Sequence, residues 1–321
     1  MFNNSINKRI MKQITNNIMM IKPVGFRCNE QTLANNYYQK VLDNLTPEKI
    51  QENALNEFNS LAEKLQSIGV NVVVIEDDKA TDTPDSIFPN NWVSFHNNGM
   101  VGLYPMCAEN RRDERRGDIF DTLVDEYGFA IEGIKDFTEF EDHDKFLEGT
   151  GSMVLDRENK ICYATISIRT DEFAVMQFCE EFDYRPVCFT ANQDVEGKRM
   201  AIYHTNVMMC VGDTFAVICL DTIDNAIERE NVIETLQETG KEIIEITEAQ
   251  KHRFAGNMLQ VMGAKPYLIM SSSAYESLTK DQIKAIEKHC PIIYSSLDTI
   301  EACGGGSARC MMTEIFLPKQ K

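Results

Sequence analysis

The fold is decided by a helix-and-strand unit near the start of the chain, where residues 46–75 read TPEKIQENALNEFNSLAEKLQSIGVNVVVI. Thr46 and Pro47 supply an N-cap and a first-turn proline, and apolar residues then recur at helical spacing. Gly69 ends this helix, and residues 70–75 form an apolar run typical of a buried strand. We therefore predict a helix that leads directly into a strand.

The same unit recurs four more times, at intervals of about 55 to 65 residues. The further helices are expected to start near Asp113, Asp171, Asn225 and Thr279. The strands after them are expected over residues 129–134, 186–190, 242–247 and 291–296. Additional strands are expected over residues 92–106, 152–166, 207–220, 258–270 and 311–317.

Five such units predict one closed α/β domain whose modules surround an axis. A dinucleotide-binding fold is excluded, because Gly149-Thr150-Gly151-Ser152 lacks a third glycine and precedes a strand instead of a helix. We expect residues 1–17 to form a disordered tail and residues 18–321 to form a single domain.

Composition excludes several classes of protein. The chain has 50 acidic and 32 basic residues, a formal net charge of −18, so it repels phosphate backbones and anionic membrane surfaces. We therefore expect no nucleic-acid partner and no membrane association. Residues 1–19 contain no apolar run of signal-peptide length, and the ten cysteines include no C-x-x-C pair. These features favour a cytoplasmic protein with reduced thiols and no structural zinc.

One polar residue follows the strand of each module after ten to fourteen residues. These residues are Asp85, Glu148, His204, Asn257 and Cys310. If the modules surround an axis, the five side chains converge at one end of it, where a cysteine, a histidine and two carboxylates can support nucleophilic catalysis. Taken singly, each has a simpler interpretation: a structural cysteine, a satisfied histidine, or a turn glutamate. On the same reading Gly304-Gly305-Gly306 is only a flexible loop.

Six motifs in order carry a resemblance to a known superfamily. They are Pro84-Asp85-Ser86-Ile87-Phe88, Arg111-Arg112-Asp113-Glu114, Leu147-Glu148-Gly149-Thr150-Gly151, Ser167-Ile168-Arg169-Thr170, Tyr203-His204-Thr205-Asn206 and Arg309-Cys310-Met311. The chain resembles the guanidine-modifying (pentein) superfamily, and within it the arginine-deiminase-related group that includes a citrulline-utilisation hydrolase. The resemblance implies a five-module, pseudo-fivefold α/β-propeller.

The resemblance also implies catalytic roles. Cys310 would be the nucleophile and His204 the general acid and base. Glu148 would hold the imidazole and contact the terminal nitrogens of the substrate. No metal or organic cofactor is implied.

Substrate-binding roles follow in the same way. Asp85 would accept hydrogen bonds from substrate N–H groups, and Asn257 is grouped with the substrate-binding residues. Arg169 and one of Arg111 or Arg112 would bind the α-carboxylate, for which a guanidinium offers a bidentate edge. The alternative for Arg111 and Arg112 is a solvated run of charges.

The chain departs from the arginine-deiminase pattern at Asn206, where those enzymes carry an aspartate. An amide offers both a donor and an acceptor, as a neutral ureido group does, and it removes one charge that would compensate a guanidinium. We therefore expect hydrolysis of citrulline to ornithine, ammonia and carbon dioxide. Arginine deiminase and dimethylarginine hydrolase remain alternatives, because dimethylarginine-hydrolysing relatives also lack this aspartate. An amidinotransferase and a non-catalytic ribosome-binding member of the fold are further alternatives. The expected partner is a small-molecule substrate, and a homodimer is left open.

Overall fold

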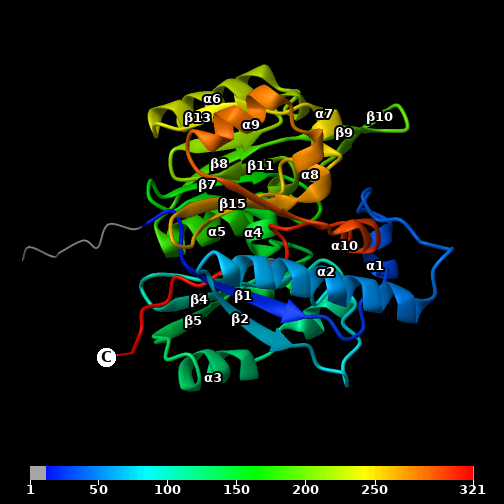
Figure 1. The fold of residues 1–321 in the computed structure, drawn as a ribbon. Helices are drawn as coiled ribbons and strands as arrows, with labels where there is room; N and C mark the ends of the chain where they lie inside the picture. The colour runs from blue at the N-terminus through cyan, green and yellow to red at the C-terminus, as the bar shows by residue number, and fades with distance from the viewer. Residues whose placement is uncertain (1–11, 321) are drawn as a thin grey trace, which may run out of the picture.

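The computed structural model describes residues 12–320, and within them the chain forms five three-stranded sheets of identical topology (Figure 1). In each sheet the central strand pairs antiparallel with one neighbour and parallel with the other.

The first sheet contains β17 (Thr313–Glu314), β1 (Asn17–Lys22) and β2 (Asn71–Glu76). The second contains β3 (Val93–Phe95), β4 (Met100–Leu103) and β5 (Gly133–Asp136). The third contains β6 (Val154–Asp156), β7 (Ile161–Thr165) and β8 (Arg185–Phe189). The fourth contains β11 (Met209–Val211), β12 (Phe215–Ile218) and β13 (Glu242–Glu245), and the fifth β14 (Leu259–Met262), β15 (Pro266–Ser271) and β16 (Ile292–Ser295).

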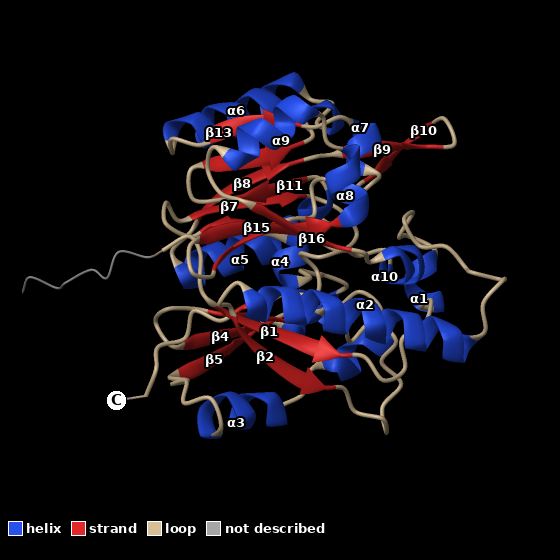
Figure 2. Cartoon of the chain, in the orientation of Figure 1, coloured by secondary structure: helices blue, strands red, loops and turns tan. Residues whose placement is uncertain are grey.

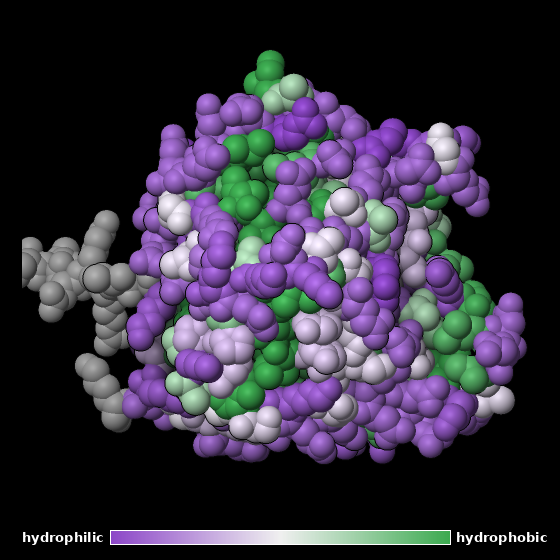
Figure 3. Space-filling view, turned by 45° about the horizontal axis from the view of Figure 1, so that its top comes forward, coloured by the Kyte–Doolittle hydropathy of each residue, from purple (hydrophilic) through white to green (hydrophobic). Residues whose placement is uncertain are grey.

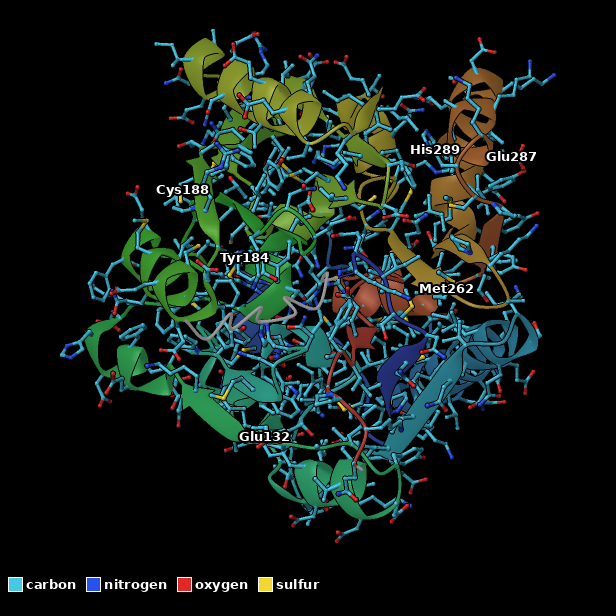
Figure 4. All side chains as sticks on the ribbon, turned by 90° about the vertical axis from the view of Figure 1, so that its left-hand side faces the viewer. Glu132, Tyr184, Cys188, Met262, Glu287 and His289 are labelled. Carbon is cyan, nitrogen blue, oxygen red and sulfur yellow. The ribbon has the colours of Figure 1, made fainter. Side chains whose placement is uncertain are left out.

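The connection between the two parallel strands of each sheet contains one helix of eight residues or more, and these five helices lie on the outside of the ring. These helices are α2 (Pro47–Ser67), α3 (Asp118–Asp125), α5 (Glu172–Phe182), α6 (Ala226–Glu238) and α9 (Lys280–Glu287). Figure 4 looks onto the ring of modules from the left of Figure 1, with Glu132, Cys188 and His289 marking three of them, and the helices lie at the periphery. The predicted propeller of five α/β modules in one domain is confirmed.

Local sequence explains where most helices begin. The side chains of Thr46, Asp171, Asn225 and Thr279 each accept a hydrogen bond from a first-turn N–H, as expected of N-caps. The second helix starts at Asp118, so the expected start near Asp113 is wrong. Residues 109–114 instead form a 3-10 turn that carries Arg111 and Glu114 into the interior.

The first sheet joins the two ends of the chain, because β1 lies between β17 and β2. The expected tail over residues 1–17 is wrong for its last part: Gln13 and Ile14 are buried, and β1 begins at Asn17. Gln13 donates to the carbonyls of Leu155 and Val211 at 3.0 and 3.1 Å, which fixes this polar residue inside the protein. The rest of the tail, residues 1–11, lies outside the described residues.

Short elements cluster at one end of the ring, at the right of Figures 1 and 2. Two of them, α1 (Glu30–Leu33) and α10 (Asp298–Gly304), lie near one another there, and α4 (Gly149–Ser152) and the turns η1 (Pro89–Asn91) and η4 (Thr205–Val207) approach the same axis. The remaining short elements are α7 (Glu248–Lys251), α8 (Ser272–Ser277), η2 (Glu109–Glu114), η3 (Thr138–His143), η5 (Leu220–Thr222) and the hairpin of β9 (Asn192–Val195) and β10 (Lys198–Ala201).

Figure 3 shows a face on which hydrophilic residues predominate around smaller apolar patches.

Candidate active site

A small cavity, partly open to solvent, lies where the modules meet. It is lined by Asn36, Asp85, Phe88, Asn91, Arg111, Arg169, Tyr203, His204, Gly304, Gly305, Gly306 and Cys310. Five of these were predicted from the sequence: Asp85, Arg111, Arg169, His204 and Cys310. Three more, Glu148, Asn206 and Asn257, contact cavity residues from behind.

His204 and Glu148 form a buried pair, with 2.7 Å between Nε2 and Oε2. Burial alone would raise the pKa of Glu148, but Arg169, the His204 hydrogen bond and Arg111 together hold it well below its usual range. Glu148 is thus a carboxylate, which can only accept, so Nε2 of His204 carries the proton. Burial lowers the pKa of His204 to about 4, against the opposing effect of Glu148. At neutral pH the imidazole is therefore uncharged, with a free lone pair on Nδ1.

The glycines after Glu148 allow this pair to form. Gly149 has a φ of +45°, and a Cβ there would collide with the backbone oxygens of Asn90 and Asn91. A Cβ on Gly151 would come within 2.8 Å of His204 Nδ1 and would also strike the Asn91 amide. The Glu-Gly-Thr-Gly-Ser motif is therefore a close-packing device that brings α4 against η1 and His204.

The nucleophile candidate Cys310 sits at the end of a tightly packed glycine segment. Cβ atoms on Gly304 and Gly306 would lie 2.7 and 2.9 Å from the Phe88 ring, and Gly305 has a φ of +64°. The glycines thus make room for an aromatic ring beside the sulfur, which contradicts the reading of this segment as only a flexible loop.

Two amides hold the sulfur of Cys310. Nδ2 of Asn206 and Nδ2 of Asn257 donate to Sγ at 3.4 and 3.2 Å. Asn257 also accepts a hydrogen bond from the backbone N–H of Arg309 at 3.0 Å, which fixes its amide orientation. The buried Oδ1 of Asn206 has no hydrogen-bond partner among residues 12–320. Both donors complement negative charge on the sulfur, and one acceptor is left for another molecule.

Asp85 is a second buried group with a free acceptor. Its Oδ2 accepts from Asn29 Nδ2 at 2.8 Å and from Thr32 Oγ1 at 3.4 Å. Its Oδ1 has no partner within the described part of the chain. Burial raises the pKa of Asp85, and Arg111 opposes that shift. A buried acceptor of this kind calls for an N–H donor from a ligand.

The three arginines have different surroundings. Arg111 is buried and pairs through Nε and Nη2 with both oxygens of Glu114 at 2.8 and 2.9 Å, so the solvated-charge reading is wrong for it. Arg112 contacts Glu141 at 3.3 Å on the rim and does not line the cavity. Arg169 is buried, lies over the ring of Tyr203 at 4.9 Å and contacts Glu148 at 3.4 Å.

A segment that sequence reasoning did not assign to the site covers one side of the cavity. We call residues 24–45 the cover segment. Asn29 contacts Asp85, Asn35 contacts Arg169, and Asn36 donates to the carbonyl of Gly304 at 3.3 Å. The signal available was the run of amide residues between 29 and 39, which lacks helical or strand periodicity.

No metal site or membrane span accompanies this cavity in the part of the chain that the structure describes. Residues 12–320 contain no group of three His, Cys, Asp or Glu side chains arranged to hold a metal ion. None of their helices is long and apolar enough to cross a membrane.

Comparison with known proteins places this site in context. The family described as eukaryotic N,N dimethylarginine dimethylhydrolase matches residues 22–317. Comparison with curated proteins finds no significant match.

Solved structures show the same fold. The N-terminal domain of ArgZ, an arginine dihydrolase from the ornithine-ammonia cycle in cyanobacteria, is 18% identical, with a TM-score of 0.71 over 94% of this chain and 99% of that one. An AgrE variant in complex with L-arginine is 16% identical, with a TM-score of 0.70 over 95% of this chain and 41% of that one. A dimethylarginine dimethylaminohydrolase variant bound to S-methyl-L-thiocitrulline is 14% identical, with a TM-score of 0.61 over 94% and 99%.

These neighbours share the pentein fold, and the family match covers almost the whole chain. The protein is therefore a member of the eukaryotic-type N,N dimethylarginine dimethylhydrolase family, a family of guanidino C–N hydrolases within the guanidine-modifying (pentein) superfamily.

Proposed function

We propose that the protein hydrolyses the ureido group of citrulline to ornithine, ammonia and carbon dioxide. The observation that supports this most is the environment of the nucleophile: the sulfur of Cys310 is held by the amides of Asn206 and Asn257. The free Oδ1 of Asn206 is a neutral acceptor, suited to an N–H of an uncharged ureido group. A carboxylate at this position would compensate a guanidinium better.

In this proposal the residues of the cavity lining carry out each step of the reaction. His204 Nδ1 takes the proton of Cys310, and the thiolate attacks the ureido carbon. The imidazolium, held by Glu148, gives this proton to the nitrogen that leaves as the C–N bond of the ureido carbon breaks. A thiocarbamate then remains on the sulfur of Cys310. Water, deprotonated by His204, cleaves the S–C bond and regenerates the thiol. The carbamate that results loses carbon dioxide, so one citrulline and one water yield one ornithine, one ammonia and one carbon dioxide.

Charged residues of the cavity lining bind the amino-acid end of the substrate in this proposal. Arg169 binds the α-carboxylate in this proposal. The Nε–Nη2 edge of Arg111 is already occupied by Glu114, so in this proposal Arg111 orients Asp85 and Asn91 and does not bind the carboxylate. Asp85 accepts a substrate N–H through its free Oδ1.

Arginine is the second candidate substrate, and a specific observation favours it. The unpaired carboxylate oxygen of Asp85 can neutralise a guanidinium as well as an α-ammonium group. The family match also brings methylated arginines into consideration. The same catalytic residues would then release ammonia or an alkylamine and leave citrulline as product.

A product assay separates these substrates. Purified enzyme is incubated with citrulline, arginine, N,N-dimethylarginine or agmatine, and ornithine, citrulline and ammonia are quantified. We expect ornithine from citrulline, and a kcat/KM for citrulline roughly tenfold or more above that for arginine, because one buried hydrogen-bonding partner differs in charge. Accumulation of citrulline from arginine, without its further consumption, would refute the proposal.

A further inference from the structure

Arg111 and Arg169, the two buried arginines of the cavity, have different partners on the Nε–Nη2 edge of the guanidinium group. The Nε–Nη2 edge of Arg111 holds the carboxylate of Glu114. The corresponding edge of Arg169 is directed at one neutral oxygen, Oδ1 of Asn35, with Nε at 3.0 Å and Nη2 also in contact. One arginine is thus closed by a charged partner, whereas the other is closed by an amide.

The Nε–Nη2 edge is a face on which guanidinium groups bind carboxylates through two parallel hydrogen bonds. The amide of Asn35 offers this edge one oxygen and no charge. A carboxylate ligand would therefore bind Arg169 more strongly than Asn35 does, whereas it would have to displace another carboxylate to bind Arg111.

Arg169 needs an acceptor even without a ligand. Its side chain is only 3% exposed, and its contact with Glu148 at 3.4 Å uses only Nη1. A buried guanidinium with an unsatisfied edge is costly. Asn35 satisfies that edge from the cover segment, and it is itself only partly buried. It can leave Arg169 without exposing a core side chain to water.

We propose that Asn35 occupies the α-carboxylate subsite of the ligand-free enzyme and that an amino-acid substrate must displace it from Arg169. This inference rests on the proposed function only in requiring that the substrate is an α-amino acid. Displacement moves a residue that is next to Asn36, whose amide contacts Gly304 and Gly305 beside the nucleophile. Ligands without a carboxylate leave Asn35 in place, so the contact weakens the binding of amino acids and does not change the binding of their decarboxylated analogues.

Two substitutions of Asn35 test the displacement, because they should change the affinity for amino-acid ligands in different directions. Asn35→Asp places a charged acceptor on the edge, so amino-acid ligands should bind roughly 10- to 100-fold more weakly. Asn35→Ala removes the competitor, so binding should be unchanged or up to about tenfold tighter. Agmatine, which lacks the carboxylate, should bind both variants within about twofold of wild type.

The measurement is calorimetric titration of Cys310→Ser protein, which does not turn over, with citrulline, arginine, ornithine and agmatine. Asn44→Asp and Asn44→Ala are matched controls, because Asn44 lies in the same cover segment and is exposed. These controls should bind all ligands as the parent does. Thermal unfolding of each variant confirms that it is folded.

The outcomes separate this inference from the citrulline assignment. If arginine but not citrulline binds, and Asn35→Asp weakens it, the substrate assignment fails and the displacement stands. Weaker binding by Asn35→Ala, or unchanged binding by Asn35→Asp, overturns the displacement, because Asn35 would then contact the substrate itself or play no part. Binding of none of the amino acids overturns it as well. A crystal structure with ornithine should show Arg169 on the ligand carboxylate, and a retained Asn35–Arg169 contact would contradict us.

Discussion

The back wall of the cavity and its cover segment are built in different ways. The back wall places His204, Glu148 and Cys310 at matching points of repeated modules, where glycines bring backbone into close contact. The cover segment lies between β1 and α2 of the first module only, and it is attached mainly through amide side chains such as Asn29 and Asn35. In the proposed function the repeated modules therefore position the catalytic residues, whereas the cover segment acts on the amino-acid end of the substrate through Arg169.

The largest effect is expected at the back wall. Cys310→Ser replaces the nucleophile with a poorer one of similar size, so turnover should fall at least roughly 10³-fold while the protein stays folded. Adding His204→Ala should cost little more, because the two residues act as a unit. Steady-state kinetics and thermal unfolding measure both. A serine variant that retains most of its activity would remove the basis for a covalent mechanism.

The next effect concerns the partner of the imidazole. In Glu148→Gln the amide can still accept the hydrogen bond from His204 Nε2, but the negative charge is lost. We expect kcat to fall roughly 10²- to 10³-fold, the usual range for acid–base groups. Unchanged kcat would show that the charge of Glu148 does not support the protonated imidazole.

The pH profile of the wild type checks the same pair. Burial lowers the pKa of His204 to about 4, so Nδ1 is free to accept a proton above that pH and is blocked below it. The acid limb of kcat/KM assigned to His204 should therefore lie well below the ordinary histidine pKa of about 6.5. In Glu148→Gln, which loses a group that raises the pKa of His204, this limb should move to still lower pH. A limb near pH 6.5 in the wild type would contradict the buried, neutral imidazole.

Substitution of Asn206 should change the preference between arginine and citrulline more than it changes the turnover rate. Asn206→Asp adds a carboxylate beside Cys310, which should favour arginine over citrulline by roughly ten- to a hundredfold in relative kcat/KM. Both substrates are assayed with both proteins. An unchanged ratio would mean that Asn206 does not sense substrate charge.

The smallest effect is expected in the cover segment. Gln39 donates to the carbonyl of Cys303 at 3.1 Å and accepts from Thr32 at 2.9 Å. Gln39→Ala removes both hydrogen bonds, so it should loosen the segment and raise KM by about three- to tenfold, with kcat unchanged, because each hydrogen bond contributes on the order of 1 kcal/mol. A fall in kcat as large as that of Glu148→Gln would erase the distinction between the two regions.

The two regions also differ in how far sequence predicts them. Helix caps such as Thr46 and Thr279 are local signals, and the repeated polar positions led to Glu148 and Cys310. The strand β17 is only two residues long, and its partner β1 follows a polar stretch, so the closure of the ring has little local pattern. The contact of Asn35 with Arg169 joins side chains 134 positions apart and leaves no periodicity to read.

The start of the second helix shows the same limit. Apolar residues recur at helical spacing only from Ile119 onward, and residues 109–114 form a 3-10 turn in which Arg111 pairs with Glu114. The helix begins only at Asp118. The acidic and basic residues before Asp118 gave no local signal for the exact start of the helix.

A competition assay tests the central claim most directly. Wild-type enzyme receives citrulline labelled with ¹³C at the ureido carbon, mixed with an equal concentration of unlabelled arginine, and the loss of each is followed over time. The ratio of the two initial rates equals the ratio of kcat/KM. We predict that citrulline is consumed first and yields labelled carbon dioxide and ornithine in equal amounts. Consumption of arginine first, with labelled citrulline left intact, would contradict the assignment.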